Sequence, residues 1–554
     1  MKNYIEKHLE DAFKQLGENV GPLMLEQPKD PSMGDYALTN AFIMAKRLKK
    51  APHLLAKDWV DKLNQLEIVK TYFKLSVVGP YLNIHLKDKL LVELFSRYKE
   101  PYIQKKKQGK SMLLEFVSAN PTGPLHLAHG RGAIVGDVLS NLFEYFGHKV
   151  TREYYVNNTG NQINEFLSSV IHSISTQYNL NLSYQQFYKG EYIQDIAQDC
   201  YLKFKDKFTQ KTLTTDDELE IVNFAIDNLV NQSISILKNV GIHFSTISYE
   251  TEIMKKNYLS EIINNLSNKK LIRVGQLNMP KDYQDTKKDN EITIFNSTVF
   301  GDDEDRAITK NDGTPTYFAN DIAYHVDKHK RGFSKLINIW GADHLGYLKR
   351  LSAALTSLYP EIDFSVVFCQ IVNLKRNNQI QKLSKREGNI FELKDLIDEI
   401  GVDNFRYFMC YRKNDTHMDL DIDLIKKENK ENPIYYIQYS YARAQSVLDK
   451  ANKIISSKTP ITADVKNLYK KLLEWDSVVF YAYKKTEVQI VAHYLESLAS
   501  FFHTLWSSAK NNPAVRFLDD DGNINEHFHA LITNYQSVLK KGLNILGIEP
   551  KLKM

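Results

Sequence analysis

Periodic and alternating apolar positions divide the chain into stretches of different character. Residues 1 to about 100 carry helical periodicity over Asn3–Leu16 and Ala37–Lys50, and Tyr72–Leu86 alternates like two strands interrupted by a Gly-Pro pair. This mixture predicts a small α+β domain. The polar, charged segment Gln104–Lys110 that follows is typical of a linker between domains.

The next stretch has the order strand, turn, helix, strand. Ser111–Val117 is an apolar run of buried-strand length, and the turn-rich residues SANPTGP follow it. A helical pattern then covers Leu125–Phe146, and Gly147 after it is typical of a helix C-cap. Lys149–Val156 alternates like a strand. This order predicts the opening of a doubly wound nucleotide-binding sheet.

The remaining pattern completes a multidomain architecture. Residues 160 to about 290 are rich in Asn, Gln, Ser and Lys and mostly helical in pattern, which indicates an insertion. The sheet pattern resumes at Lys335–Gly341 and Phe364–Val372, and from about residue 425 the pattern is helical to the end. We therefore predict an N-terminal α+β domain (1–104), an α/β Rossmann-type domain (105–424) with a mostly helical insertion (about 160–290), and a C-terminal all-α domain (425–554).

Composition narrows the class of protein. Hydrophobic residues make up 43% of the 554 residues, which is typical of a globular protein, and the net charge of +5 permits a nucleic-acid partner without requiring one. The three cysteines are far apart and form no CxxC pair, so the sequence supports neither a disulfide framework nor a cysteine-rich zinc site. No apolar run approaches the ~20 residues that span a membrane, and the first residues lack the apolar core of a signal peptide. We expect a cytoplasmic protein.

Two histidines at the start of the predicted central helix are the strongest chemical signal. His126 and His129 lie in PTGPLHLAHGR, three residues apart after a tight turn. A helix start presents backbone N–H groups and a positive dipole end, and imidazoles there can donate hydrogen bonds to phosphate oxygens. A metal site is an alternative, but it needs a third ligand, and the HExxH motif has its histidines four apart. Simple capping or packing is a third interpretation. We favour phosphate binding.

A second motif, QKLSKREGN, lies between a predicted strand and a helix. Lys382 and Lys385 flank Ser384, and a basic loop of this kind can hold the phosphates of a departing pyrophosphate. Alone, such a run in a lysine-rich chain is more often a solvated surface. The two motifs together, in this order and on opposite halves of one sheet, are far more specific than either.

The pair resembles the HIGH and KMSKS motifs of class I aminoacyl-tRNA synthetases, and longer stretches resemble the arginyl-tRNA synthetases. These stretches are GDYALTNAF, EFVSANPTGPLHLAHGRGAIVGD, REYYVNNTGNQI, FGDDEDRAITKNDGTPTYFANDIAYH, WGADHLGYLKRL, NPIYYIQYSYARAQSVL and GLNILGIEP. The resemblance therefore runs nearly end to end. Two residues depart from the pattern: Ala128 stands where the HIGH motif usually has glycine, and Asn158 stands where aspartate is more usual.

The resemblance implies an arginine–tRNA ligase that activates L-arginine with ATP and Mg²⁺ and charges tRNA-Arg, without a protein-bound metal, a membrane or an obligate protein partner. The implied ATP-binding residues are His126, His129, Gly130, Lys382, Ser384 and Lys385. The first domain would bind tRNA, the second would be catalytic and the third would bind the anticodon. The alternatives are a class I synthetase for another amino acid, a nucleotidylyltransferase that works without tRNA, and a catalytically silent tRNA-binding protein.

The implied arginine site consists of acidic and aromatic residues. Tyr317 and Asp321, four residues apart on one helical face, would take the guanidinium group, and Glu115 would add negative charge. Asn120 would hold the α-amino end, assisted by His344. From the residues alone, Asp321 could instead be a helix N-cap and Tyr317 a core aromatic.

The implied anticodon contacts are less sharply defined. Stacking faces and a charge for splayed anticodon bases would come from Tyr435, Tyr439 and Arg443. The alternative for this run, read from the residues alone, is an ordinary helix core.

Overall fold

A five-stranded parallel sheet forms the centre of the structure, a computed structural model that describes residues 2–28, 30–97, 111–209, 212–276, 292–381, 391–456 and 461–554. In spatial order the strands are β12 (Asp363–Cys369), β11 (Lys335–Gly341), β5 (Ser111–Glu115), β6 (Lys149–Val156) and β7 (Thr246–Tyr249). All neighbouring pairs are parallel. The chain proceeds from β5 to one side and later returns to build the other side, which confirms the predicted doubly wound arrangement.

Helices connect these strands. α6 (Leu127–Tyr145) joins β5 to β6, α12 (Tyr317–Lys330) precedes β11, and α13 (Tyr347–Leu358) joins β11 to β12. α6 is apolar around most of its circumference and is buried along most of its length, because the sheet packs on one side and helices from the last part of the chain pack on another.

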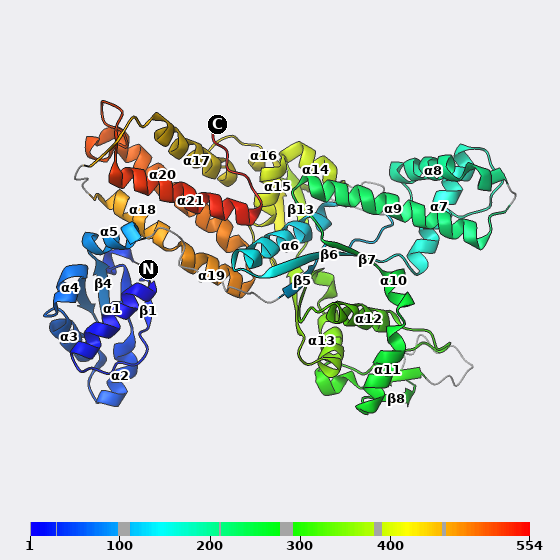
Figure 1. The fold of residues 1–554 in the computed structure, drawn as a ribbon, viewed down its shortest axis with the longest axis horizontal. Coiled ribbons are helices and arrows are strands. Elements are labelled where there is room, and N and C mark those ends of the chain that lie inside the picture. Colours follow the sequence, from blue (N-terminus) through cyan, green and yellow to red (C-terminus); the bar gives the residue numbers. More distant parts are fainter. Residues whose placement is uncertain are drawn as a thin grey trace.

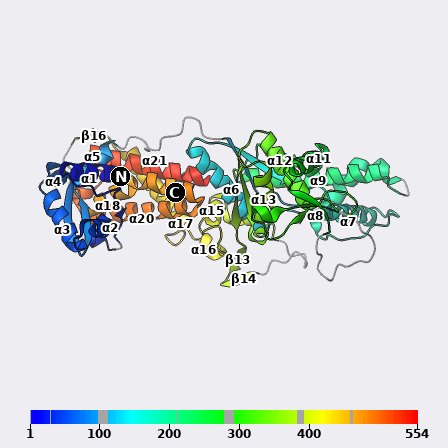
Figure 2. The same cartoon turned by 90° about the horizontal axis from the view of Figure 1, so that it is seen from below.

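Residues 161–275, within the mostly helical insertion predicted over about 160–290, contain five α-helices and two short strands. The first part of this insertion is the helices α7 (Asn161–Gln177), α8 (Glu191–Phe204) and α9 (Thr215–Asn239), which project from one end of the molecule (Figures 1 and 2). The chain then returns to the sheet as β7 before a second part. That part comprises α10 (Glu250–Lys255), α11 (Tyr258–Asn268), β8 (Ile272–Gly275), β9 (Ile292–Phe295) and β10 (Arg306–Ala307). With four residues, β7 is too short for its alternation to stand out between helical patterns.

A small second sheet follows the five-stranded sheet along the chain. Its strands are β14 (Gln379–Gln381), β13 (Val372–Arg376) and β15 (Met418–Asp421), and α14 (Leu393–Ile400), α15 (Val402–Met409) and α16 (Ile422–Ile425) accompany it.

The C-terminal part of the chain is helical, as predicted. Its helices are α17 (Pro433–Lys450), α18 (Ala463–Leu473), α19 (Trp475–Lys485), α20 (Gln489–Asn511) and α21 (Glu526–Leu546), beside the two-residue strands β16 (Ile454–Ile455) and β17 (Ile524–Asn525). Within the described ranges, no helix of the protein is both long enough and apolar enough to cross a membrane.

Arg406 lies where three parts of the chain meet. This fully buried residue of α15 donates hydrogen bonds to the carbonyl oxygen of Leu546 at the end of α21 (2.7 Å) and to that of Val240 after α9 (2.6 Å). It also forms an ion pair with Asp137 of α6. A Cβ atom at Gly547, which ends α21 with φ +69°, would overlap this guanidinium group. Through Arg406, α15 is thus connected to α6, to the end of α9 and to the end of α21.

The N-terminal residues form the predicted α+β domain, at the end of the molecule opposite the insertion helices (Figure 1). Its elements are α1 (Lys2–Gln15), β1 (Leu25–Glu26), β2 (Tyr36–Leu38), α2 (Asn40–Leu48), α3 (Pro52–Leu63), α4 (Glu67–Tyr72), β3 (Phe73–Val78), β4 (Tyr81–Leu86) and α5 (Asp88–Arg97). The predicted strand pair is the β3–β4 hairpin.

The N-terminal domain docks on α18. Leu473, from the end of α18, is a member of the hydrophobic core of the N-terminal domain. Lys466 of α18 lies 3.0 Å from Asp88, and Lys470 pairs with Asp35. A hydrophobic contact and two ion pairs therefore hold the first and last domains together.

Candidate active site

The strand order of the sheet reverses between β5 and β11, and several predicted site residues lie near this point. Glu115 ends β5, opposite Asn338 of β11 on one side and Glu153 of β6 on the other. In open α/β sheets, ligands bind in the crevice beyond the strand ends at such a switch point. The two-histidine turn follows β5 directly, so its position after the strand is that of a ligand-binding loop.

His126 and His129 lie side by side at the first turn of α6. His126 is the N-cap, and its backbone N–H donates to Nδ1 of His129 over 3.2 Å. The two half-buried rings have centroids 3.9 Å apart. The capping interpretation is thus confirmed for His129, and capping itself holds both imidazoles at the positive end of the helix. That position suits phosphate oxygens as well.

The chain beyond the predicted basic loop returns to the histidine turn. Glu392 forms a β-bridge with His126, and the backbone N–H of Leu393 donates to the carbonyl of Leu125 over 2.8 Å. A Cβ atom at Gly130 would lie 2.8 Å from the Leu393 side chain, so α6 approaches α14 too closely for a larger residue. The segment that follows the basic loop is therefore fixed against the first turn of α6.

Tyr317 and Asp321 both lie on α12, but Asp321 does not cap the helix and Tyr317 is not part of the core. The N-cap of the helix is Thr316, whose hydroxyl accepts the backbone N–H of Ala319 over 3.3 Å. Asp321 lies one turn inside the helix, so the cap interpretation is wrong. Tyr317 is 65% exposed, so the core interpretation is wrong as well. The hydroxyl of Tyr347, at the start of α13, donates to Asp321.

The carboxyl group of Asp321 has a pKa well above the usual value for aspartate. Burial is the main cause that raises its pKa to about 7, and the nearby carboxylates of Glu250 and Glu115 raise it further, while the hydrogen bond from Tyr347 opposes the rise. A carboxyl group in this state gains charge when a cation binds beside it. A strongly perturbed pKa is also a common mark of a functional site.

Glu115 forms a buried ion pair. Its carboxylate lies 2.5 Å from Nζ of the fully buried Lys328 of α12 and accepts the hydroxyl of Ser118 over 3.0 Å. Lys328 also contacts the side chain of Asn338, 3.3 Å away. This network ties β5, α12 and β11 together near the end of β5, so Glu115 acts as a structural counter-ion to Lys328.

Three family models match the chain in succession. The N-terminal domain model of arginyl-tRNA synthetases covers residues 1–86, the model "tRNA synthetases class I (R), catalytic domain" covers 92–421, and the DALR anticodon binding domain covers 437–554. The chain belongs to the arginyl-tRNA synthetase family. The order of the three models also agrees with the predicted order of the three domains, although our own boundaries at 104 and 424 stay a prediction.

Curated relatives match the chain over nearly their whole length. An arginine–tRNA ligase from Pelagibacter ubique is 33% identical, with 99% of this chain and 98% of the relative covered. One from Jannaschia sp. is 35% identical, with 99% and 97% covered. The solved Thermus thermophilus arginyl-tRNA synthetase has a TM-score of 0.70 at 18% identity, over 100% of both chains, and shows that the fold is shared.

Asn120 and His344 are both exposed. The side chain of Asn120 donates to that of Gln162, at the start of α7, over 2.9 Å. His344 follows β11, is 61% exposed at its side chain and lies 3.5 Å from Asp343. Both follow strands that border the switch point, but the structure does not bring them into contact with Asp321.

Glu250 lies beside Asp321 in the candidate site, and the sequence interpretation missed it. It is buried, directly follows β7, and accepts a hydrogen bond from Asn320 of α12 over 3.1 Å. Because the surrounding residues were assigned to an insertion, nothing marked Glu250 as the end of a sheet strand. Asn158, the departure from the family pattern, exchanges two hydrogen bonds with Thr251. Its amide therefore helps to fix the start of α10 beside Glu250.

The other departure and the anticodon residues have clear surroundings. Ala128 is exposed on the first turn of α6. On α17, the guanidinium group of Arg443 donates to the hydroxyl of Tyr439 over 2.8 Å and lies 4.1 Å from its ring centroid, and Tyr435 stacks on Tyr439 at 6.1 Å. The three side chains thus form one partly exposed cluster. Its role in binding tRNA stays a prediction.

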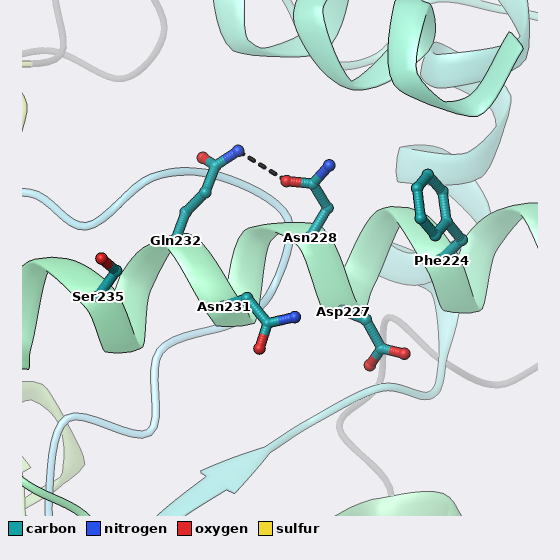
Figure 3. Close-up of a pocket in the computed structure, with 6 residues that line it drawn as sticks. All are labelled: Phe224, Asp227, Asn228, Asn231, Gln232 and Ser235. Atoms are coloured by element: carbon teal, nitrogen blue, oxygen red, sulfur yellow. Dashed lines mark hydrogen bonds between the residues drawn. The ribbon is translucent and has the colours of Figure 1, made fainter. Parts of the chain in front are cut away.

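Some predictions fall elsewhere. Lys382, Ser384 and Lys385 lie outside the described residues. Over the part of the chain that is described, no three His, Cys, Asp or Glu side chains are grouped to hold a metal ion. A pocket on α9 is lined by Phe224, Asp227, Asn228, Asn231, Gln232 and Ser235, with Gln232 donating to Asn228 over 2.7 Å (Figure 3). It contains none of the predicted site residues.

Proposed function

We propose that this protein activates L-arginine with ATP and transfers it to tRNA-Arg in the cytoplasm. In the first step, a carboxylate oxygen of arginine attacks the α-phosphorus of ATP and the bond to pyrophosphate breaks. In the second step, a ribose hydroxyl at the tRNA 3′ end attacks the arginyl carbonyl and AMP leaves. Mg²⁺ would arrive with ATP. The observation that carries the proposal is the histidine turn and the acidic α12 site on the two sides of one switch point.

The phosphate chemistry belongs to the histidine turn and the basic loop. His126 and His129, held together at the positive end of α6, would donate to phosphate oxygens as their negative charge increases. Gly130 contributes by allowing the close approach of α14. Lys382, Ser384 and Lys385 would hold the departing pyrophosphate, supported by the anchoring of Glu392 against the histidine turn.

Arginine recognition belongs to α12 and the strands around it. A guanidinium group is a planar fork of donors, whereas lysine presents a compact charge, so a well-placed carboxylate can separate the two by geometry. Asp321 and the exposed hydroxyl of Tyr317 would receive this fork. Glu115, although paired with Lys328, would add negative charge near the guanidinium group. Asn120 would hold the α-amino end of arginine, assisted by His344.

The tRNA would contact both outer domains. The cluster of Tyr435, Tyr439 and Arg443 presents aromatic faces and a guanidinium group, which are the groups that bind unstacked anticodon bases. The N-terminal domain, held on α18, would contact another part of the same tRNA.

Replacement of Asp321 by asparagine tests the proposal. Asp321→Asn keeps the shape but removes the charge and one acceptor, so we expect kcat/KM for arginine to fall about 10- to 100-fold, as for a lost charged hydrogen bond. ATP binding measured by calorimetry should barely change. The assay is arginine-dependent pyrophosphate exchange with tRNA present, beside charging with each of the twenty amino acids.

Asp303→Asn is the matched control, because Asp303 is an exposed aspartate paired with Lys349 outside the crevice. It should leave exchange unchanged. If Asp321→Asn exchanges pyrophosphate at the wild-type rate, α12 does not bind the guanidinium group of arginine. If the protein charges tRNA with a different amino acid, the proposed substrate is wrong.

A further inference from the structure

Tyr347 is held tightly by groups that have no other assigned role. It is the first residue of α13, and its hydroxyl donates to Oδ2 of Asp321. Its ring contacts Phe318 edge-on with centroids 6.4 Å apart and Trp340 at 6.0 Å. The guanidinium carbon of Arg350 lies 5.6 Å from its ring centroid. Rings and a cation therefore restrict the rotation of this phenol, so its hydroxyl has a fixed direction.

We propose that Tyr347 is a positioning residue for arginine recognition, which fixes the plane of the Asp321 carboxylate and leaves its second oxygen to receive the substrate. The inference rests on the proposed function. A carboxylate on a rotatable bond can present its oxygens in many planes, whereas a guanidinium fork requires one plane. A donor held on Oδ2 selects that plane before the substrate arrives, so less ordering is required on binding.

The same hydrogen bond controls the charge of Asp321. The charged and titratable groups that face it are Tyr347 from α13, Glu250 from α10, Glu115 from β5, Tyr155 from β6 and Lys328 from α12. Burial and the two glutamates raise the pKa of Asp321, whereas the Tyr347 hydroxyl and Lys328 lower it. Loss of the hydroxyl should therefore raise this pKa above 7. More of the carboxyl would then be protonated at neutral pH, and a neutral carboxyl cannot pair with a guanidinium cation.

The test is Tyr347→Phe, which keeps the ring and its packing. We expect KM for arginine at pH 7 to rise about 5- to 10-fold, as for one lost hydrogen bond, while KM for ATP stays constant. The deficit should shrink as the pH rises towards 9, because Asp321 ionises again. The readout is tRNA-supported pyrophosphate exchange between pH 6.5 and 9, with the thermal midpoint of each variant measured beside it.

Tyr359→Phe is the matched control from the other end of the same helix. The hydroxyl of Tyr359 also donates to a carboxylate, that of Glu261, over 3.2 Å, and this pair has no place in the crevice. The control should show no change in either KM. An arginine deficit in Tyr347→Phe that is equal at every pH, or no deficit at all, would overturn the inference. Absence of arginine-dependent exchange in the unaltered protein would instead reject the proposed function.

Discussion

The junction around Arg406 gives the most direct prediction about stability. Arg406→Met keeps most of the side-chain length and its apolar packing but removes the charge and every donor. Two buried carbonyl groups, those of Leu546 and Val240, then lose a hydrogen bond, and Asp137 loses its closest cation. Arg152, whose Nε is 3.4 Å from Asp137, still compensates part of that charge.

The magnitude follows from these losses. Removing one partner of a buried ion pair costs about 3–5 kcal/mol, and since Arg152 remains, we expect about 4 kcal/mol for the pair and the two carbonyls together. For a chain of 554 residues, the unfolding entropy is roughly 1.2 kcal/mol per kelvin if the molecule unfolds as one unit. The thermal midpoint should therefore fall by about 3 °C. Arg406→Lys keeps the charge but has fewer donors, so its thermal midpoint should lie between those of the wild type and Arg406→Met.

A thermal melt followed by circular dichroism measures this, with Arg376→Met as the matched control. Arg376 forms a partly exposed pair with Glu399, which also has Lys426 as a partner. Surface pairs are worth at most about 1 kcal/mol, so the control should lose less than about 1 °C. If both variants lose the same amount, the Arg406 junction carries no special stability and the reasoning fails.

Two further predictions concern the reaction. His129→Ala should slow adenylate formation, because the transition state loses about 2–4 kcal/mol of stabilisation, as for one preorganised donor. Arginine binding should change little. Stoichiometric zinc in the purified protein would contradict this role. Pyrophosphate exchange should require tRNA, because the outer domains must engage it before the crevice closes. Full exchange measured without tRNA would reject that coupling.

Elements with long, distinct patterns could be predicted from the sequence, and contacts between distant segments could not. The strand Lys149–Val156 was predicted with the bounds that the structure gives, and α6 within two residues at its start and one at its end. β7 was missed because four residues do not establish a pattern, and Glu250 was missed with it. Nothing in the sequence pairs Glu115 with Lys328, which is 213 positions away. Two residues that a fold brings together across such a distance leave no periodic signal.

The place of Leu473 in the N-terminal core has a consequence for synthesis of the protein. The elements of the N-terminal domain end at Arg97, yet the residue that completes its core comes 376 positions later. At roughly 5–20 residues per second, a ribosome takes about 20 to 75 seconds to cover that distance. During this interval, the newly made domain exposes the apolar surface that α18 later covers. The speed of translation between residues 97 and 473 therefore sets how long this apolar surface of the N-terminal domain stays exposed to solvent.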